Sequence, residues 1–283
     1  METMCKKVRQ IFSVAHYQYI EWLLSGKQIV VLIILFFLMQ YVSKPLDALS
    51  EKTNIPFQWT EIFLATVNSV YFIPIILFCF ITLMSEFPKR SYEDLNILFR
   101  TKRANWYYGQ VLFGIYAVIT FIAEMAGLFL LRTISFTYLD NGWSPIIKNY
   151  MERYLEEGKR CGVVAVVSSE VYNHFSPNEA FFYNVLLLFG MFLEINFILM
   201  LFNLLNRKAT GVVTIVLMTI LGVGMIYMKS DYLMLFPIGN AMPKCHNLPV
   251  TKLTEWYEPV LYFFVSNGVL VIVGKLIIKR IQL

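Results

Sequence analysis

Two acidic residues, Glu124 and Glu194, are the side chains whose placement in this chain points most directly to a function. Both lie inside long apolar runs, and the amide of Asn196 follows Glu194 closely. A charge at the centre of a bilayer costs roughly 2.5–3.5 kcal/mol, so such side chains normally face protein or water. Each is therefore a candidate either for helix–helix hydrogen bonding or for lining a substrate path or a subunit interface.

No recognisable catalytic centre accompanies these acids. The three histidines are scattered and form no HExxH pair, which argues against an intramembrane metalloprotease. The chain has no GxSxG serine motif. The nearest match to a Walker A loop, Gly268–Lys275, lacks the Ser or Thr and lies within an apolar run. We expect a protein that is not an enzyme and that itself binds no metal or cofactor.

The composition is that of a membrane protein. Hydrophobic residues make up 58 % of the 283 residues and charged residues 15 %, whereas soluble domains contain roughly 45–50 % and about 25 %. The mean hydropathy is +0.59. The four cysteines form no CxxC pair, so neither a zinc ribbon nor a thioredoxin-like motif is expected. The net charge of +5 fits membrane topology, and no nucleic-acid partner is expected.

The apolar runs predict an all-α polytopic protein with one transmembrane domain over residues 1–283. A crossing helix needs about 20 mostly apolar residues to span about 30 Å of hydrocarbon. The alternation expected of barrel strands is absent, so the spans are expected to be helices. The six predicted spans are residues 27–44, 62–83, 107–131, 181–205, 210–228 and 259–278.

Basic residues set the expected orientation. With a cytoplasmic N-terminus, fourteen of the 24 Lys and Arg residues lie on short inner segments, which is the usual cytoplasmic bias. The turn Asn206-Arg207-Lys208 is the clearest single indication. Both termini are therefore predicted to be cytoplasmic.

Two inner segments carry helical signals. Residues 5–25 have apolar side chains at helical spacing and a basic start, which predicts an amphipathic helix at the inner interface, near anionic lipid. It serves either as a membrane anchor alone or also as a docking element for a cytoplasmic partner. Residues 91–103, between the second and third spans, are either a solvated loop or a coupling helix that docks on a soluble subunit. The residues assigned to such coupling are Ser91, Glu93, Asp94, Leu95, Leu98, Phe99 and Arg100.

The outer segments are longer. Residues 132–179 predict a small cap with a surface helix around Ile146 and Ile147. Residues 232–239 are apolar but too short to cross, and Pro237 and Gly239 interrupt them, so a re-entrant or interfacial element is expected before the last span. Cys161 and Cys245 both fall on the outer side, where a disulfide between them is possible in an oxidising compartment.

This layout resembles the membrane subunit of type-2 ATP-binding-cassette (ABC) transporters. The resemblance is to bacterial half-size permeases of peptide export and bacteriocin self-immunity. It rests on topology over nearly the whole chain and on the local sequence pattern of two stretches. The outer loop after the third predicted span is longer than is typical of that family. The stretches are Leu98-Phe99-Arg100-Thr101-Lys102-Arg103 with Trp106 and Gly109-Gln110, and Phe236-Pro237-Ile238-Gly239-Asn240-Ala241-Met242.

The resemblance implies a function and a set of partners. The chain would sit in the bacterial plasma membrane, pair with a second permease (identical or homologous) and dock two separate ATPase subunits, which would hold ATP and Mg. Its substrate would be an amphipathic peptide, such as an antimicrobial peptide, or a lipid-like molecule. The alternative is a non-transporting membrane protein: a sensor, an assembly factor or an unrecognised membrane enzyme.

Overall fold

The structure is a computed structural model that describes residues 2–88, 101–133, 141–153, 169–246 and 256–280. Over these residues the chain is helical and contains no strand. Five helices are long and apolar enough to cross a membrane. They are α2 (Gly26–Thr53), α6 (Arg103–Thr133), α11 (Pro177–Leu204), α12 (Lys208–Met228) and α14 (Glu258–Arg280). The predicted fold class, an all-α multi-pass membrane protein, is confirmed.

The second predicted span, residues 62–83, is divided into two short helices in the structure. Helix α3 (Trp59–Val67) ends at Asn68, and α4 (Ile73–Met84) begins beside Pro74, whose ring removes a backbone donor. At 12 residues, α4 is only about 18 Å long and too short to cross alone. Five long helices are therefore present where six were predicted, and a crossing by the α3–α4 pair stays a prediction.

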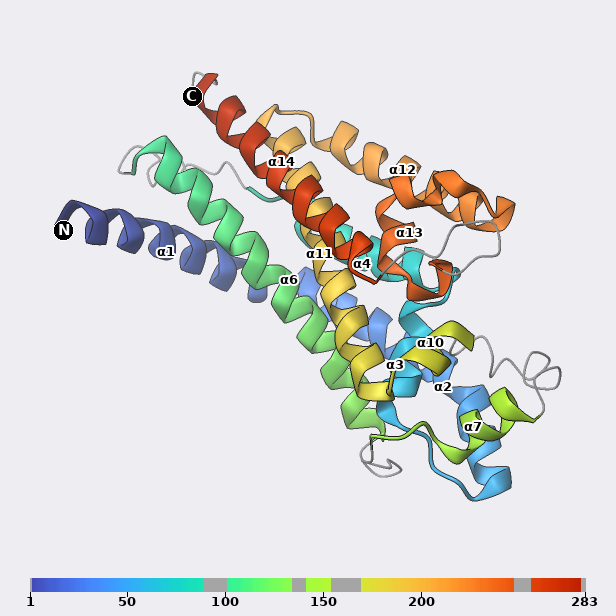
Figure 1. The fold of residues 1–283 in the computed structure, drawn as a ribbon. Coiled ribbons are helices and arrows are strands. Elements are labelled where there is room, and N and C mark those ends of the chain that lie inside the picture. Colours follow the sequence, from blue (N-terminus) through green and yellow to red (C-terminus); the bar gives the residue numbers. More distant parts are fainter. Residues whose placement is uncertain (1, 89–100, 134–140, 154–168, 247–255, 281–283) are drawn as a thin grey trace.

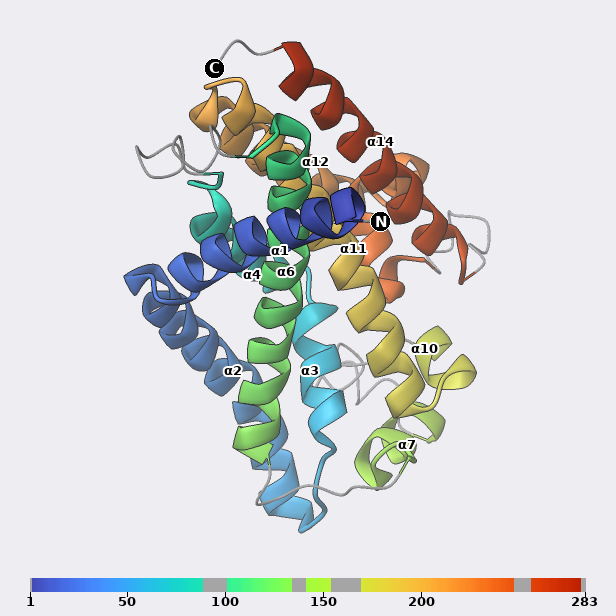
Figure 2. The ribbon, with the colours of Figure 1, turned by 90° about the vertical axis from the view of Figure 1, so that its left-hand side faces the viewer.

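The α3–α4 pair nevertheless returns the chain to the end of the molecule where α2 starts. The ammonium of Lys27, at the start of α2, lies 2.6 Å from a carboxylate oxygen of Glu86, just after α4. Helix α3 lies among α2, α6 and α11 (Figure 2). The pair thus leads back alongside the long helices. Helix α2 itself is longer than its predicted span and continues through Lys44 and Pro45 to Thr53.

Helix α1 (Glu2–Leu23) precedes α2, with only Leu24 and Ser25 between them. It packs along the first half of α6 (Figure 1). The two helices run in the same direction, so residue numbers increase together along both. The Asn105 amide donates to the Gln10 side chain at 2.8 Å, and the Tyr19 and Thr120 hydroxyls lie 2.8 Å apart. The buried face of the predicted amphipathic helix is therefore packed against protein. Its place at the inner interface stays a prediction.

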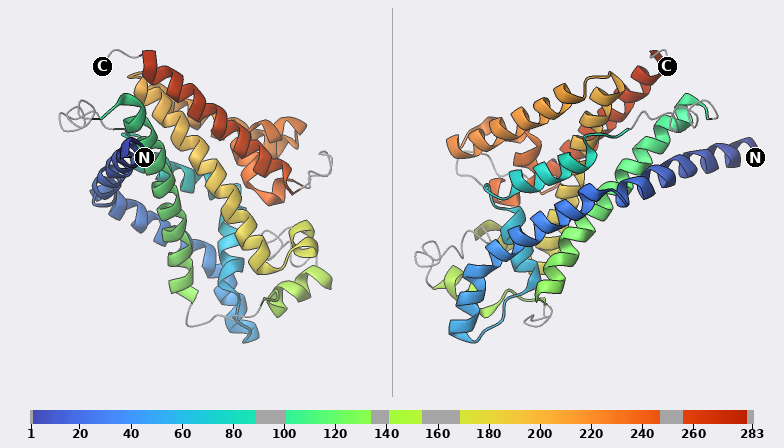
Figure 3. Two further views of the ribbon diagram at one scale, coloured as in Figure 1. Left: turned by 60° about the vertical axis from the view of Figure 1, so that its left-hand side comes forward. Right: turned by 180° about the vertical axis from the view of Figure 1, so that it is seen from behind.

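Helix α11 is the centre of the bundle and the most deeply buried of the long helices. It contacts α3, α4, α6, α12, α13 and α14. Helices α12 and α14 lie at the periphery (Figure 3). They expose many large apolar side chains, as helices that face lipid would. The core is thus built around one helix, and the outer helices attach to it.

Two sets of shorter helices lie between the long ones. In the outer loop, α7 (Pro145–Glu152) buries Ile146 and Ile147, which is the surface helix predicted there, and α10 (Ser169–His174) follows. Between α12 and α14 the chain forms η1 (Asp231–Leu235), α13 (Pro237–Ala241) and η2 (Pro243–Cys245). Every residue of α13 is buried, and it contacts α11, α12 and α14. The predicted re-entrant-like stretch therefore folds back into the bundle.

Candidate functional site

The predicted coupling residues, Ser91 to Arg100, lie outside the described residues, but the chain on both sides of them is described. On one side, the Asn203 amide of α11 donates to the carbonyls of Ser85 and Phe87, at 3.1 and 2.5 Å. On the other side, Asn105 at the start of α6 is bonded to Gln10 of α1. The segment between Phe87 and Asn105 is thus anchored to α11 at one end and to α1 at the other.

Glu124 faces the start of α2. The side-chain amide of Gln28 donates to both of its carboxylate oxygens, at 2.7 and 2.9 Å. No basic side chain among the described residues forms an ion pair with Glu124. The acid is half-buried and serves as an acceptor for an interhelical bond between α6 and α2. The sequence did not indicate Gln28, because it lies beside Lys27 at the edge of a span.

Glu194 lies between α11 and α14 and is 4 % exposed. Its Oε1 accepts a hydrogen bond from the Tyr262 hydroxyl at 3.3 Å, and its Oε2 accepts one from the Ser266 hydroxyl at 3.1 Å. The Tyr262 hydroxyl also lies 3.3 Å from the carbonyl oxygen of Leu235 at the end of η1. We call Glu194, Tyr262, Ser266 and the Leu235 carbonyl the Glu194 cluster. It joins α11, α14 and η1.

Asn196 is on the opposite side of α11 and does not join Glu194. Two residues along a helix correspond to a rotation of about 200°, and the Asn196 amide packs against Gly114 of α6. Further along α11, the Asn184 side-chain oxygen accepts a bond from Asn68 of α3 at 3.2 Å. Together with Asn203, these residues give α11 a polar contact with each of four different neighbours. The structure therefore separates the three predicted substrate-path residues into three different interfaces.

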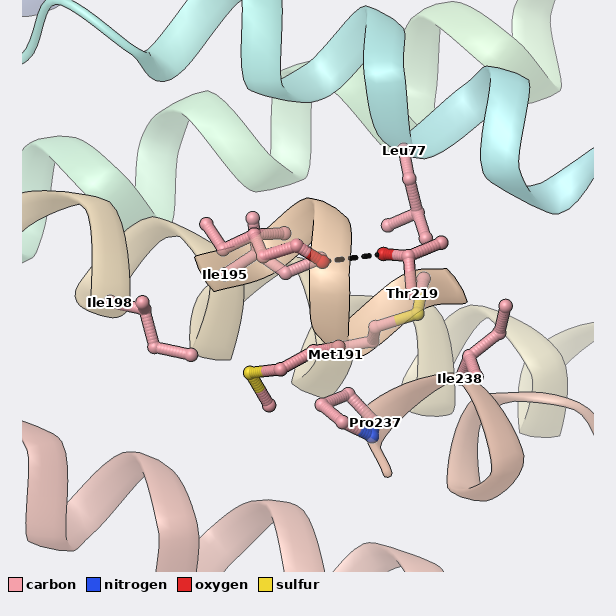
Figure 4. Close-up of a pocket in the computed structure, with 9 residues that line it drawn as sticks. Leu77, Met191, Ile195, Ile198, Thr219, Pro237 and Ile238 are labelled. Atoms are coloured by element: carbon pink, nitrogen blue, oxygen red, sulfur yellow. Dashed lines mark hydrogen bonds between the residues drawn. The ribbon is translucent and has the colours of Figure 1, made fainter. Parts of the chain in front are cut away.

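A small apolar pocket lies between α4, α11, α12 and α13 (Figure 4). Its one polar side chain, Thr219, donates to the carbonyl of Ile215 on its own helix at 2.9 Å, so its hydroxyl is already used. The sequence did not indicate this pocket, since its lining comes from four separate helices. The lining residues are Leu77, Met191, Ile195, Ile198, Ile215, Met218, Thr219, Pro237 and Ile238.

The end of the bundle where α3 meets α7 is held together by Glu61, which the sequence analysis also missed. Its carboxylate accepts from the backbone of Gln58 at 3.1 Å, inside the first turn of α3, and from the backbone of Ser144 at 2.6 Å. The Ser144 hydroxyl in turn accepts from Ile147 and caps α7. One buried carboxylate thus caps α3 and fixes the start of α7, so that the outer loop packs on the bundle.

Cys245 and His246 lie in the same buried segment after α13. Cys161 lies outside the described residues, so its disulfide with Cys245 stays a prediction. Burial raises the pKa of the Cys245 thiol to about 12. Burial also lowers the pKa of His246 to about 4, although its bonds to backbone groups of Asn240 and Gly239 oppose the shift. His246 is therefore neutral near pH 7. The described residues contain no group of three or more potential metal ligands.

Comparison of the chain with protein-family models, with curated proteins and with solved structures finds no match in any of the three.

Proposed function

We propose that this chain is the membrane subunit of an ATP-driven ABC transporter that exports or clears an amphipathic peptide or a lipid-like substrate. In this proposal it acts in a bacterial plasma membrane with both termini cytoplasmic. It pairs with a second permease, and two separate ATPase subunits bind ATP and Mg. The proposal rests on the layout resemblance together with the anchoring of the predicted coupling segment.

The observation that carries the proposal is how the flanks of residues 88–104 are attached. Phe87 is bonded to Asn203 at the end of α11, and Glu86 is paired with Lys27 at the start of α2. Asn105 is bonded to α1. A force applied to a docked coupling segment would therefore reach α1, α2, α6 and α11 directly. Such contacts suit a switch between two packed arrangements driven by a partner.

Roles for the buried polar residues follow from their positions. Met191 and Ile195, on either side of Glu194 along α11, line the apolar pocket, and Glu194 is proposed to lie on the substrate path. Glu124 and Asn196 each bond or pack within a single helix interface, and we propose that they hold helices together. Helix α1 is proposed to move with the coupling segment, because Gln10 of α1 is bonded to Asn105, which closely follows that segment.

Co-purification tests the proposal. The chain is purified from native membranes in a mild detergent, as wild type and with the charge reversals Glu93→Lys, Asp94→Lys and Arg100→Glu combined. The wild-type protein is expected to recover an ATPase subunit, and the variant is expected to recover about tenfold less of it. The reason is that like charges would then face each other across the interface. The control is Glu51→Lys, an exposed charge reversal at the other end of α2.

Two results would contradict the proposal. If the triple variant recovers as much ATPase as wild type does, the coupling assignment is wrong. If wild type recovers no ATPase, the transporter proposal is wrong, and a sensor, an assembly factor or an unrecognised membrane enzyme takes its place.

A further inference from the structure

The contacts of Tyr262 in the Glu194 cluster require one more hydrogen than this side chain carries. Its hydroxyl oxygen lies 3.3 Å from Glu194 Oε1 and 3.3 Å from the Leu235 carbonyl oxygen. A tyrosine hydroxyl has a single hydrogen to donate. As long as Glu194 is ionised, it can only accept, so one of these two oxygen–oxygen contacts has no hydrogen between its atoms.

The other oxygen of Glu194 has a complete hydrogen bond. The Ser266 hydroxyl donates to Glu194 Oε2 at 3.1 Å. The Ser266 hydroxyl also lies 3.4 Å from the Phe263 carbonyl, but that carbonyl already accepts from the Asn267 amide at 2.8 Å. The Ser266 hydrogen is therefore available to Glu194, and the missing hydrogen concerns the contacts of Tyr262 alone.

No cation among the described residues balances an ionised Glu194. The side chain is 4 % exposed, and its titratable neighbour is the neutral phenol of Tyr262. Helices α4 and α13, which also contact α11, contain no charged residue, and α6 packs on the opposite side of α11, against Asn196. The charged residues of α12, η1 and α14 form no ion pair with Glu194; they are Lys208, Asp231, Glu258, Lys275, Lys279 and Arg280.

The position of Glu194 along α11 places it far from water if this helix crosses a bilayer. It stands ten residues before Leu204, the end of the helix, and seventeen after Pro177, its start. These separations correspond to about 15 and about 25 Å, so a hydrocarbon core about 30 Å thick would enclose the carboxyl group. An isolated carboxylate in such surroundings is costly enough that the group takes up a proton instead.

A proton on Glu194 Oε1 supplies the missing hydrogen. The carboxyl group then donates to the Tyr262 oxygen, and Tyr262 donates its own hydrogen to the Leu235 carbonyl. The second carboxyl oxygen continues to accept from Ser266. Every contact in the cluster then contains one hydrogen, and no charge remains to be balanced.

We infer that Glu194 binds a proton in the packed bundle, and that this proton completes a hydrogen-bonded link from α11 through Tyr262 to η1. When the proton leaves to water, the Tyr262 hydrogen turns to the carboxylate, and the Leu235 carbonyl loses its donor. The link between α14 and η1 is thus made in the protonated state and broken in the ionised one. This inference goes beyond the proposed function, because the link needs no ATPase.

Infrared absorption of the purified full chain in a neutral detergent tests for the proton. A protonated carboxyl group has a carbonyl band that is separate from those of carboxylates and amides. At pH 7 we expect wild type to show such a band and Glu194→Gln to lose it. Glu124→Gln is the matched control and should lose nothing from this band, because Gln28 donates to both oxygens of Glu124 at 2.7 and 2.9 Å, as suits an ionised acid.

Tyr262→Phe tests the link to η1, and it does so even if Glu194→Gln does not fold. In this variant the carboxyl hydrogen loses its acceptor. The band is therefore expected to remain and to shift to higher frequency. Ser266→Ala, which removes a donor to the other oxygen, is the comparison and should not free the carboxyl hydrogen.

Equilibrium unfolding from pH 5.5 to pH 7 measures the energetic effect of the proton. The unfolded chain releases it near the ordinary glutamate pKa of about 4.3, whereas the folded wild type keeps it, so wild-type stability falls as the pH rises. The amide in Glu194→Gln can donate to Tyr262 and accept from Ser266 but does not titrate. The stability of this variant relative to wild type should therefore rise by up to about tenfold in the folding equilibrium constant for each pH unit. His246 is present in both proteins, so its contribution cancels.

Three results would overturn the inference. The proton site is wrong if Glu194→Gln keeps the whole protonated-carboxyl band, or if its stability depends on pH as wild type does. The link to η1 is wrong if Tyr262→Phe leaves the frequency of the band unchanged. None of these measurements involves an ATPase, so their failure would leave the transporter proposal standing, and the absence of an ATPase would leave the proton site standing.

Discussion

Several polar side chains of the helices have a specific partner in the bundle. Gln28 donates to Glu124, Asn68 to Asn184, and Ser266 to Glu194. The helical period predicts that Glu194 and Asn196 point to different sides of one helix, and they do. It cannot predict the partners, because Ser266 is 72 positions from Glu194 and the pairing depends on which helices meet.

His246 makes the stability of the buried segment after α13 dependent on pH. Its pKa is about 4 in the folded chain, because burial disfavours the charged ring, against 6.5 when exposed. The unfolded chain therefore binds more protons between these values, so stability is lost as the pH falls below about 6.5. His246 by itself is expected to contribute a loss of about 2 kcal/mol between pH 7 and pH 5.

Thermal unfolding of the purified protein from pH 7.5 to pH 5 measures this effect. His246→Gln keeps an amide donor but cannot titrate, so its unfolding midpoint should fall less than that of wild type. His174→Gln, at the end of the outer helix α10, is the matched control. Equal pH dependence in wild type and His246→Gln would show that another group is responsible.

At the level of elements, hydropathy located the five long helices but not where every helix ends. Residues 62–83 form a continuous apolar run, yet the helix breaks between Asn68 and Ile73, where an Asn ends one helix and Pro74 starts the next. Helix α2 extends past Lys44, since a basic residue at the edge of an apolar run does not end a helix. The pocket was not predictable, since it needs four helices to be placed correctly.

Close packing between α11 and α14 depends on Gly190. A Cβ atom at this position would lie 2.6 Å from the Phe263 ring and 2.7 Å from its Cβ. We expect Gly190→Ala to cost about 1–3 kcal/mol, as overpacking usually does. The substitution should also separate Ser266 from Glu194, because this pair and the Gly190–Phe263 contact lie in the same interface between α11 and α14.

The control is Gly224→Ala on α12, where nothing lies within 4 Å of the added Cβ atom. Alanine favours a helix over glycine by up to about 1 kcal/mol, so this variant should be as stable as wild type or more stable. Unfolding midpoints of both variants in the same detergent measure the difference. If Gly190→Ala is no less stable than Gly224→Ala, the packing described for α11 and α14 is wrong.

For the whole molecule, the sequence predicts which helix ends share a side, and the structure gathers those ends. The start of α2 meets the chain after α4, and the end of α11 meets the same segment. The apolar runs and the positions of the basic residues were enough to predict which helix ends lie together, because that prediction does not depend on any single side-chain contact. The sequence indicated the central position of α11 only indirectly, because polar residues lie on several faces of that helix.

Cysteine labelling in intact cells tests the topology, including a crossing by α3–α4. Single cysteines are introduced at exposed positions in a cysteine-free background, at Glu51, Ala104 and Ala209. A membrane-impermeant maleimide is expected to label only the Glu51→Cys protein before lysis, and all three afterwards. Equal labelling at Glu51 and Ala104 before lysis would mean that α3 and α4 do not cross.

Helices α1 and α2 are separated by two residues, and each is bonded to α6 at a different height. Gln10 meets Asn105, and Gln28 meets Glu124, nineteen residues and about 28 Å further along α6. Helices α1 and α2 are therefore both fastened to α6, and the chain turns between them at Leu24–Ser25. A tilt of α6 would carry α1 and the start of α2 with it, because both are hydrogen-bonded to that one helix.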